Sequence, residues 1–265
     1  MKTISVSSEF LPKAKTAQAP PDIFRVPHEC LMMAKQLHLS CISQGKLVSI
    51  EGLTNEEFLL HLLRSEVDLR QKRAAAERIR QARLPCEKSF NDFDTGFQKG
   101  ISQEQLELLA RLEWLDNAFN LVLIGPPGTG KTHLALAIGS KAVNEGYKVS
   151  FSTMDNLMHM LKTQEISAKS ASRVRHIHKC DLVIVDEVGY LPVSRTEANL
   201  FFGLISSLYE SASVVITSNK GFEGWAEMLG DPVLTTALLD RLTHKCQVLD
   251  FDDVSWRLTN RQQIF

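Results

Sequence analysis

The chain has 265 residues and a formal net charge of −1, with 44% apolar and 23% charged residues, a composition that suits a globular protein with one full domain and a smaller one. Five cysteines without a close Cys-x-x-Cys pair argue against a disulfide framework or a zinc knuckle, and favour a reducing cytoplasm. Apolar runs are too short to span a membrane and the N-terminus lacks the apolar core of a secretory signal, so we expect neither a membrane protein nor an exported one.

The first part of the chain is expected to be helical, behind a disordered tail. Residues 1–24 are rich in Ser, Thr, Ala, Lys and Pro, and have too few large apolar side chains to offset the chain entropy of folding. Apolar spacing predicts a short helix over 28–39, and the capping box Thr54–Glu57 predicts the start of a long helix that runs without Gly or Pro to Pro85. We therefore expect a small all-α N-terminal domain over residues 25–88.

The two halves of this long helix differ in character. The first half carries an apolar stripe that predicts a packing face, formed by Phe58, Leu59, Leu62, Leu63 and Val67. In the second half, five cations fall on one face at about 100° per residue, as is typical of surfaces that bind phosphate backbones. A solvated helix with incidental charges is the alternative. The predicted DNA-binding residues of this helix are Arg70, Lys72, Arg73, Arg80 and Arg83.

Residues 89–265 alternate short apolar strands with helices, after an extended linker, KSFNDFDTGFQ. Strands are expected over 121–124, 148–152, 182–186, 213–217 and 246–250. Helices are expected over 102–118, 131–144, 155–178 (in two pieces), 196–209, 222–229 and 232–242. Strands separated by helices imply right-handed crossovers, so the pattern predicts an α/β nucleotide-binding domain with a five-stranded parallel sheet covered on both faces.

A phosphate-binding loop is predicted between the first strand and its helix. The pattern Gly-x-x-x-x-Gly-Lys-Thr spans Gly125–Thr132, and its glycines let backbone amides turn inward around phosphate in front of a helix N-terminus. Lys131 is expected to reach the β and γ phosphates of ATP, and the Thr132 hydroxyl to coordinate Mg²⁺. The predicted nucleotide-binding residues here are Gly125, Pro126, Pro127, Gly128, Thr129, Gly130, Lys131, Thr132 and His133.

Polar residues end two later strands at the same predicted edge of the sheet. Asp186, in LVIVDE, is expected to bind the nucleotide's Mg²⁺ together with Thr132. Glu187 follows it and is expected to polarise the water that attacks the γ-phosphate. Asn219, which ends SVVITSN, is a candidate to orient that water, although Asn is also common in the turns that end strands.

Five motifs, in this order and spacing, resemble the AAA+ ATPases of the helicase-loader branch and, more closely, the IstB transposition helper proteins encoded by insertion sequences. The motifs are GPPGTGKTHLALAIG, LVIVDEVGYLP, VVITSN, LLDRLTH and SWR. The resemblance covers roughly residues 28–260. It implies an AAA+ P-loop NTPase fold, ATP and Mg²⁺ as cofactors, and a homo-oligomeric ring or spiral.

Two arginines receive roles from this resemblance, and arginine suits both because ATP cleavage builds negative charge on the transferring oxygens. Arg241, in LLDRLTH, is implied to be an arginine finger that reaches the ATP of an adjacent subunit, and so joins Lys131, Glu187 and Asn219 as catalytic. Arg257, in SWR, is implied to be a sensor-2 arginine acting on its own nucleotide. Only about 15 residues follow the last strand, so the usual helical lid is expected to be minimal or absent.

The resemblance further implies ATP-dependent assembly on duplex target DNA, remodelling of that DNA, and its delivery to a partner transposase. A second predicted DNA-binding surface lies between the strands at 148–152 and 182–186, with ordinary solvated helix faces as the alternative. Its residues are Lys162, Lys169, Arg173 and Arg175.

Two other functions remain open at the level of sequence. A replicative helicase loader, acting on single-stranded DNA and a hexameric helicase, shares the same motor, but the N-terminal region carries no zinc-binding or helicase-docking feature that favours it. A metabolic P-loop kinase is disfavoured because no arginine-rich lid follows the sheet. His176, His178 and Cys180 are not expected to bind a metal, since a fourth ligand is missing.

Overall fold

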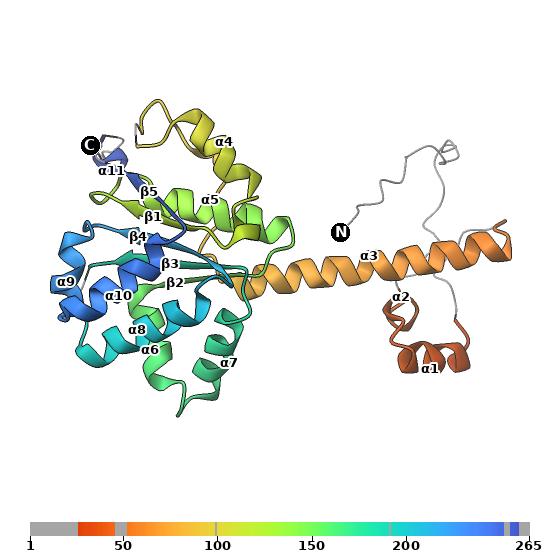
Figure 1. Ribbon diagram of the computed structural model, residues 1–265. Coiled ribbons are helices and arrows are strands. Elements are labelled where there is room, and N and C mark those ends of the chain that lie inside the picture. The colour runs from red at the N-terminus through yellow and green to blue at the C-terminus, as the bar shows by residue number, and fades with distance from the viewer. Residues whose placement is uncertain (1–25, 46–51, 99, 191, 252–254, 260–265) are drawn as a thin grey trace, which may run out of the picture. The chain divides into compact units, whose positions relative to one another are not determined.

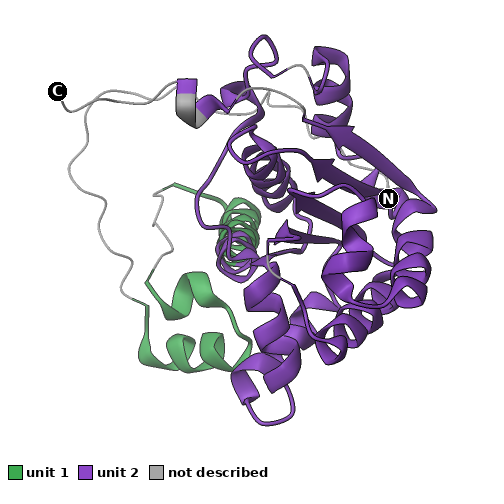
Figure 2. Ribbon diagram, turned by 90° about the vertical axis from the view of Figure 1, so that its left-hand side faces the viewer, with its two compact units in different colours: residues 1–73 green, residues 74–265 purple. Residues whose placement is uncertain are grey.

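The computed structural model describes residues 26–45, 52–98, 100–190, 192–251 and 255–259 (Figure 1). The chain divides into two compact units, Met1–Arg73 and Ala74–Phe265, with the division inside the long helix α3 (Asn55–Ala82) (Figure 2). The predicted disordered tail, residues 1–24, lies outside the described residues. Among the residues that are described, no helix is long and apolar enough to cross a membrane.

The first unit contains α1 (His28–Gln36), α2 (Ser40–Ser43) and the start of α3. The capping box predicted for α3 is present, since the Thr54 amide donates to the Glu57 carboxylate at 2.8 Å and the Glu57 amide donates to the Thr54 hydroxyl at 3.3 Å. A buried carboxylate, Glu66, joins α2 to α3 by accepting from the Cys41 amide at 2.8 Å. The apolar stripe of α3 was predicted to be a packing face, but most of it is exposed within the described chain. Leu59, for example, is 57% exposed.

The second unit is built on a five-stranded sheet in the order β2-β3-β4-β1-β5, in which every pairing is parallel. This confirms the predicted α/β architecture. The strand order places β4 between β1 and β3, so the segments that leave the carboxyl ends of these three strands are neighbours. The strands are β1 (Asn120–Ile124), β2 (Val149–Thr153), β3 (Leu182–Val188), β4 (Ser213–Ser218) and β5 (Cys246–Asp250).

Helices cover both faces of this sheet, and alternate strand residues enter two separate cores (Figure 1). Leu182 and Ile184 of β3 pack in the core that contains α5, whereas Val183 and Val185 pack in the core that contains α6, α8 and α10. The helices are α4 (Gln103–Arg111), α5 (Lys131–Asn144), α6 (Met154–Thr163), α7 (Ala168–Ile177), α8 (Arg195–Leu208), α9 (Glu223–Leu229), α10 (Pro232–Thr243) and α11 (Trp256–Thr259), with 3₁₀ turns η1 (Phe90–Asp92) and η2 (Leu115–Asn117).

Two segments differ from the sequence-based expectation. The helix predicted over 102–118 ends at Arg111, because Leu112 adopts a left-handed conformation with φ +61° and caps α4. The segment predicted as an extended linker contains η1, which is fixed by a capping box between Ser89 and Asp92. After β5, the described chain contains only the short helix α11.

Candidate nucleotide-binding site and basic surfaces

The loop between β1 and α5 requires glycine at its bends. Gly125 has φ +145°, and a Cβ there would lie 2.3 Å from the carbonyl oxygen of Phe251. Gly128 has φ +88°, and a Cβ there would lie 2.0 Å from the Ser255 hydroxyl. A side chain at either position would therefore strain the backbone and collide with the segment after β5. The loop ends at Gly130, the N-cap of α5, so the positive end of that helix dipole faces the loop.

Lys131 and Thr132 begin α5 and face the sheet edge. Lys131 is 8% exposed. Its ammonium group donates to the Pro126 carbonyl at 2.7 Å and to the Thr129 hydroxyl at 3.3 Å, so the side chain lies along the loop. The Thr132 hydroxyl donates to Asp186 Oδ1 at 2.9 Å. The structure thus brings together Thr132 and Asp186, which the sequence assigns to one magnesium site although they are 54 residues apart.

A β-bulge presents two acidic residues at the end of β3. Val185 pairs with Ile216 and Val188 with Ser218, so Asp186 and Glu187 together lie opposite the single residue Thr217 of β4. Asp186 is 5% exposed, whereas Glu187 is exposed and has φ +64°, a conformation that is uncommon for a residue with a side chain. The bulge therefore buries one carboxylate and turns the other toward solvent.

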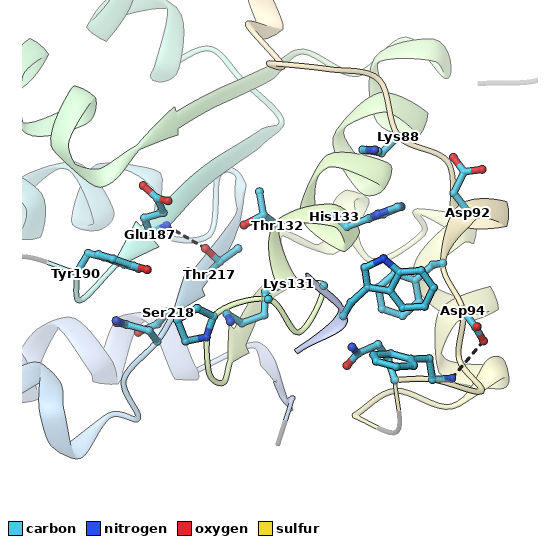
Figure 3. Close-up of a pocket in the computed structure, with 18 residues that line it drawn as sticks. Lys88, Asp92, Asp94, Lys131, Thr132, His133, Glu187, Tyr190, Thr217 and Ser218 are labelled. Carbon is cyan, nitrogen blue, oxygen red and sulfur yellow. Dashed lines mark hydrogen bonds between the residues drawn. The ribbon is translucent and has the colours of Figure 1, made fainter. Parts of the chain in front are cut away.

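Thr217, which was not expected from the sequence to belong to the site, contacts both acidic residues. Its hydroxyl donates to Asp186 Oδ1. It also accepts from the Glu187 amide at 2.9 Å (Figure 3). A hydroxyl has one proton to donate and lone pairs to accept, so Thr217 satisfies both groups at once. The available sequence signal was its position, two residues before Asn219, in a strand that ends with polar residues.

Lys131, Thr132, Glu187 and Thr217 line a cavity of about 380 Å³. In Figure 3, Glu187 and Tyr190 lie at one end of it, Lys88, Asp92 and Asp94 lie at the other, and Lys131 and Thr132 lie between them. The second end is formed by the segment expected to be a plain linker, together with α11. The lining residues that sequence reasoning missed are Lys88, Asp92, Phe93, Asp94, Phe97, Gln98, Tyr190, Thr217, Ser218 and Trp256.

Aromatic rings gather at this second end. Phe97 meets Trp256 edge to face with ring centroids 4.8 Å apart, and Phe93 meets the His133 ring in the same manner at 5.8 Å. The Trp256 amide donates to the carbonyl of Gly128 at 3.0 Å, which fixes α11 against the phosphate-binding loop. Flat apolar surface beside a phosphate loop is the environment that a nucleotide base requires.

Three polar side chains around the cavity hold buried atoms that have no hydrogen-bond partner within the described chain. They are both side-chain polar atoms of Gln98, which is 5% exposed, Oδ1 of Asn219 and Nε2 of His133. Burial and the nearby charge of Lys88 lower the pKa of His133, so its imidazole is held neutral at pH 7. Unpaired buried polar atoms are costly, so these atoms are available to hydrogen-bond a polar ligand or a water molecule.

Sequence comparison decides the family. Residues 35–264 match the family of IstB-like ATP binding proteins. The chain belongs to the IstB-like ATP-binding family. It is 42% identical over 235 residues to an insertion sequence IS21 ATP-binding protein from Pseudomonas aeruginosa, covering 88% of this chain and 89% of that one. It is 34% identical over 232 residues to an insertion sequence IS5376 ATP-binding protein from Geobacillus stearothermophilus, covering 86% of this chain and 92% of that one.

Two solved structures have a fold similar to that of this IstB-like chain. The alignment with the structure of DnaI covers 62% of this chain and 90% of DnaI, with a TM-score of 0.53 and 18% sequence identity. The alignment with the DnaC helicase loader covers 62% of this chain and 96% of the loader, with a TM-score of 0.50 and 20% sequence identity. At such identities the likeness shows the fold alone, and it agrees with the AAA+ architecture predicted from the sequence.

The cavity of this IstB-like protein fits the ATP that its family binds. Gly125 and Gly128 keep side chains out of the loop, the ammonium group of Lys131 lies at its rim, and aromatic rings stand at the far end. The hydroxyl of Thr132 and the carboxylate of Asp186 are hard oxygen donors held 2.9 Å apart, as a Mg²⁺ site requires. When bound, Mg²⁺ would draw negative charge away from the phosphates.

The two predicted arginines lie apart from this site or outside what is described. Arg241 is on α10 and is not among the residues that line the cavity of its own chain. Its guanidinium donates to the Ala237 carbonyl at 2.9 Å and lies over the Phe202 ring, 4.8 Å from the centroid. Arg257 belongs to α11, but its side chain lies outside the part that the structure describes.

Some cations of the predicted basic face of α3 form hydrogen bonds or ion pairs with other residues, and others are exposed. Arg70 donates to Glu66 at 2.7 Å and to the His38 carbonyl at 3.1 Å, and Arg73 donates to the Ser40 hydroxyl at 2.6 Å, so both tie α3 to the rest of the first unit. Arg80 pairs with Glu77 on its own helix. Lys72 is exposed, and Arg83 follows the end of α3.

The second predicted DNA surface is also uneven. Lys162 forms an ion pair with Glu197 at 2.7 Å, while Lys169 and Arg175 are exposed on α7. Arg173 is only 5% exposed, so it is not the pore-facing surface residue that the sequence suggested. Its guanidinium donates to the Ser150 hydroxyl at 2.9 Å and to the Phe151 carbonyl at 3.2 Å, because α7 packs directly on β2.

Proposed function

We propose that the protein is a cytoplasmic Mg²⁺-dependent ATPase that assembles on duplex DNA, remodels it and delivers it to a partner transposase. The observation that carries the ATPase part is that Lys131, Thr132 and Glu187 line one cavity and that Thr132 is hydrogen-bonded to Asp186. The transposition part is supported by sequence relatives that are ATP-binding proteins of insertion sequences.

In the proposed reaction each residue of the chain has a separate task. Lys131 shifts from the Pro126 carbonyl to the phosphates, and the backbone amides of the loop bind the phosphate oxygens. Glu187 lies at the tip of β3, facing solvent, where it accepts a proton from the attacking water. The unpaired Oδ1 of Asn219 lies at the same sheet edge and accepts a hydrogen bond from that water, which fixes its line of approach.

Arg241 supplies the remaining positive charge from a neighbouring subunit in this proposal. In its own chain its guanidinium does not line the nucleotide cavity. An arginine finger in trans makes hydrolysis depend on assembly, since a single subunit lacks the charge that stabilises the transition state. The functional assembly is therefore a ring or spiral of identical subunits, with Arg257 acting on the nucleotide of its own subunit.

DNA binding is assigned first to the exposed cations of the predicted surfaces. Lys72, Lys169 and Arg175 are exposed on two helices and are available to phosphates. Arg70, Arg73, Arg80 and Lys162 already have partners, so their contribution to DNA binding requires exchange of those contacts.

Glu187→Gln tests the ATPase proposal. The variant should bind ATP as the wild type does, because the substituted group does not hold the phosphate loop, and should lose at least about 100-fold in turnover because the general base is gone. Nucleotide affinity and phosphate release are measured in parallel. Hydrolysis at the wild-type rate would remove Glu187 from the proposed mechanism.

Electron microscopy with an ATP analogue separates transposition helper from helicase loader. We expect regular assemblies on duplex DNA and none on single-stranded DNA of equal length. Assemblies on the single strand alone would instead favour a loader that acts on a hexameric helicase.

A further inference from the structure

A second cavity, of about 550 Å³, lies at the carboxyl end of β2 and shares no lining residue with the nucleotide site. Its walls come from the segment after α3, from the end of β2, and from α6 and α7. Both helices pack against β2. All of these residues belong to the second compact unit. We call it the basic cavity, because its lining includes Arg83, Lys169, Arg173 and His159 but no Asp or Glu.

The positive charge of this cavity is not neutralised by the described chain. No carboxylate forms an ion pair with Arg83, Lys169 or Arg173 among the described residues, and the Arg173 guanidinium donates to carbonyl and hydroxyl oxygens. Burial and the neighbouring charge of Arg83 lower the pKa of Arg173 to about 10, so the guanidinium remains charged at pH 7. A buried cation next to a second cation is costly unless an anion joins them.

Unpaired hydrogen-bonding groups at the cavity independently indicate a polar ligand. Ser152 lines the cavity and is 6% exposed. Its hydroxyl has no hydrogen-bond partner in the described chain, and neither has Nε of Arg173. The first turn of α7, a helix of ten residues capped by Ser167, also borders the cavity. Its leading amides carry the positive end of the helix dipole.

We propose that the basic cavity binds a phosphate group through Arg83, Lys169, Arg173 and the Ser152 hydroxyl. A tetrahedral oxyanion has enough acceptors for two guanidinium groups, an ammonium group and a hydroxyl, whereas a metal cation would be repelled. We assign this phosphate group to a phosphodiester of the DNA backbone, because Arg83 and Lys169 are exposed at the rim of the cavity. This assignment rests on the proposed function. A free phosphate ion offers the same chemistry, so the test has an arm for each source.

The first arm uses inorganic phosphate and thermal unfolding of the full chain, with the nucleotide site saturated by ADP and Mg²⁺. Phosphate should raise the melting temperature of the wild type in a dose-dependent manner. Lys169→Gln, Arg83→Gln and the uncharged change Ser152→Val should each abolish most of that rise. Lys179→Gln is the matched control, because Lys179 is exposed just after α7 and lines neither cavity.

The second arm measures duplex DNA affinity over a range of salt concentrations. Lys169→Gln and Arg83→Gln should each reduce the slope of log affinity against log salt by about 0.9 per phosphate group that the variant no longer binds, relative to Lys179→Gln. Loss of phosphate stabilisation with unchanged DNA slopes would assign the cavity to a free phosphate ion. Variants that match Lys179→Gln in both arms would overturn the proposal.

The two arms also separate this proposal from the proposed function. If the wild type fails to bind duplex DNA, the proposed function fails, but the phosphate arm still decides what the cavity binds. Arg173 is left unchanged throughout, because its contacts with β2 make it a part of the fold.

Discussion

Thr217 links the two acidic residues on which the proposed chemistry depends. Its hydroxyl donates to Asp186 Oδ1 and accepts from the Glu187 amide at 2.9 Å. Asp186 is thereby oriented toward Thr132, and the backbone of Glu187 is held in its uncommon conformation with φ +64°. We regard Thr217 as a positioning residue, because it acts through these acids.

Thr217→Val should therefore lower the rate of ATP hydrolysis by about 10- to 100-fold, as is usual when a hydrogen-bond partner of a metal-binding group is removed. The substitution keeps the shape of the side chain and deletes its hydroxyl. ATP affinity without Mg²⁺ should change little, while the concentration of Mg²⁺ needed for half-maximal activity should rise. Thr217→Ser restores the hydroxyl and is expected to restore activity; failure of that rescue would mean that packing is what matters.

Gln98 is the best candidate for recognition of the nucleotide base. It is 5% exposed, both side-chain polar atoms lack a partner in the described chain, and it lines the cavity together with Phe93, Phe97 and Trp256. A carboxamide offers a donor beside an acceptor, which matches the amino group and ring nitrogen of adenine. The edge of guanine that carries its carbonyl oxygen presents a different pattern.

We expect Gln98→Leu to reduce the preference for ATP over GTP by about 10-fold or more, the usual worth of such a paired contact. Equilibrium binding of both nucleotides gives the ratio. Inorganic tripolyphosphate, which has no base, is the control and should bind the variant as it binds the wild type. Equal losses for all three ligands would mean that Gln98 supports the loop instead.

At the level of elements, the sequence predicted the helices and strands whose limits have a clear sequence signal. It did not predict local irregularities such as a β-bulge. The helix at 131–144 and the strand at 246–250 coincide with α5 and β5, because a Gly-rich loop and a short apolar run mark their limits. The strand predicted to end at Asp186 continues to Val188 through the bulge, which depends on pairing with β4 and has no signature in β3 alone.

The aromatic end of the nucleotide cavity shows the same limit. Phe93 and Phe97 are set in a polar stretch without periodicity, so the sequence suggested only a linker. Their role arises from tertiary contacts with His133 and Trp256, which are distant in the chain. The break of α4 at Leu112 was missed for a related reason, since the usual glycine of a left-handed cap is absent.

The ion pair between Lys162 of α6 and Glu197 of α8 provides a prediction at this scale. Hydrogen bonds from Lys162, and then from Ser194 at the start of α8, lower the pKa of Glu197 from 4.5 to about 2. Because the folded-state pKa is depressed, the contribution of Glu197 to stability is present above pH 4.5 and is lost as the pH falls toward 2.

Lys162→Met should lower the free energy of unfolding at pH 7 by at most about 1 kcal/mol, since the lysine is half exposed, and that difference should narrow as the pH falls from 4.5 toward 2. Urea unfolding at several pH values measures both quantities. Lys179→Met, which removes an exposed lysine just after α7, serves as the control. A difference that stays constant with pH would mean that Lys162 stabilises the fold by packing alone.

At the level of the whole molecule, the chain holds a nearly complete nucleotide site but leaves Arg241 away from it. Within one chain this arginine is positioned by the Ala237 carbonyl and the Phe202 ring, and not by the nucleotide cavity. Such fixed placement lowers the entropy that the side chain loses when it meets a ligand on another subunit. ATP hydrolysis in this arrangement would report on assembly.

Mixing two inactive variants tests that dependence. Arg241→Ala should lose about 10³-fold or more in hydrolysis, as other arginine fingers do, while Lys131→Ala should lose nucleotide binding at its own site. A subunit carrying Lys131→Ala still offers Arg241 to a neighbour, and a subunit carrying Arg241→Ala still offers an intact ATP site. Activity should therefore appear on mixing, peak near equal proportions and vanish at either extreme, because active interfaces form only between unlike subunits. If mixtures stay as inactive as their components while wild-type subunits assemble and hydrolyse ATP, Arg241 does not act across the interface.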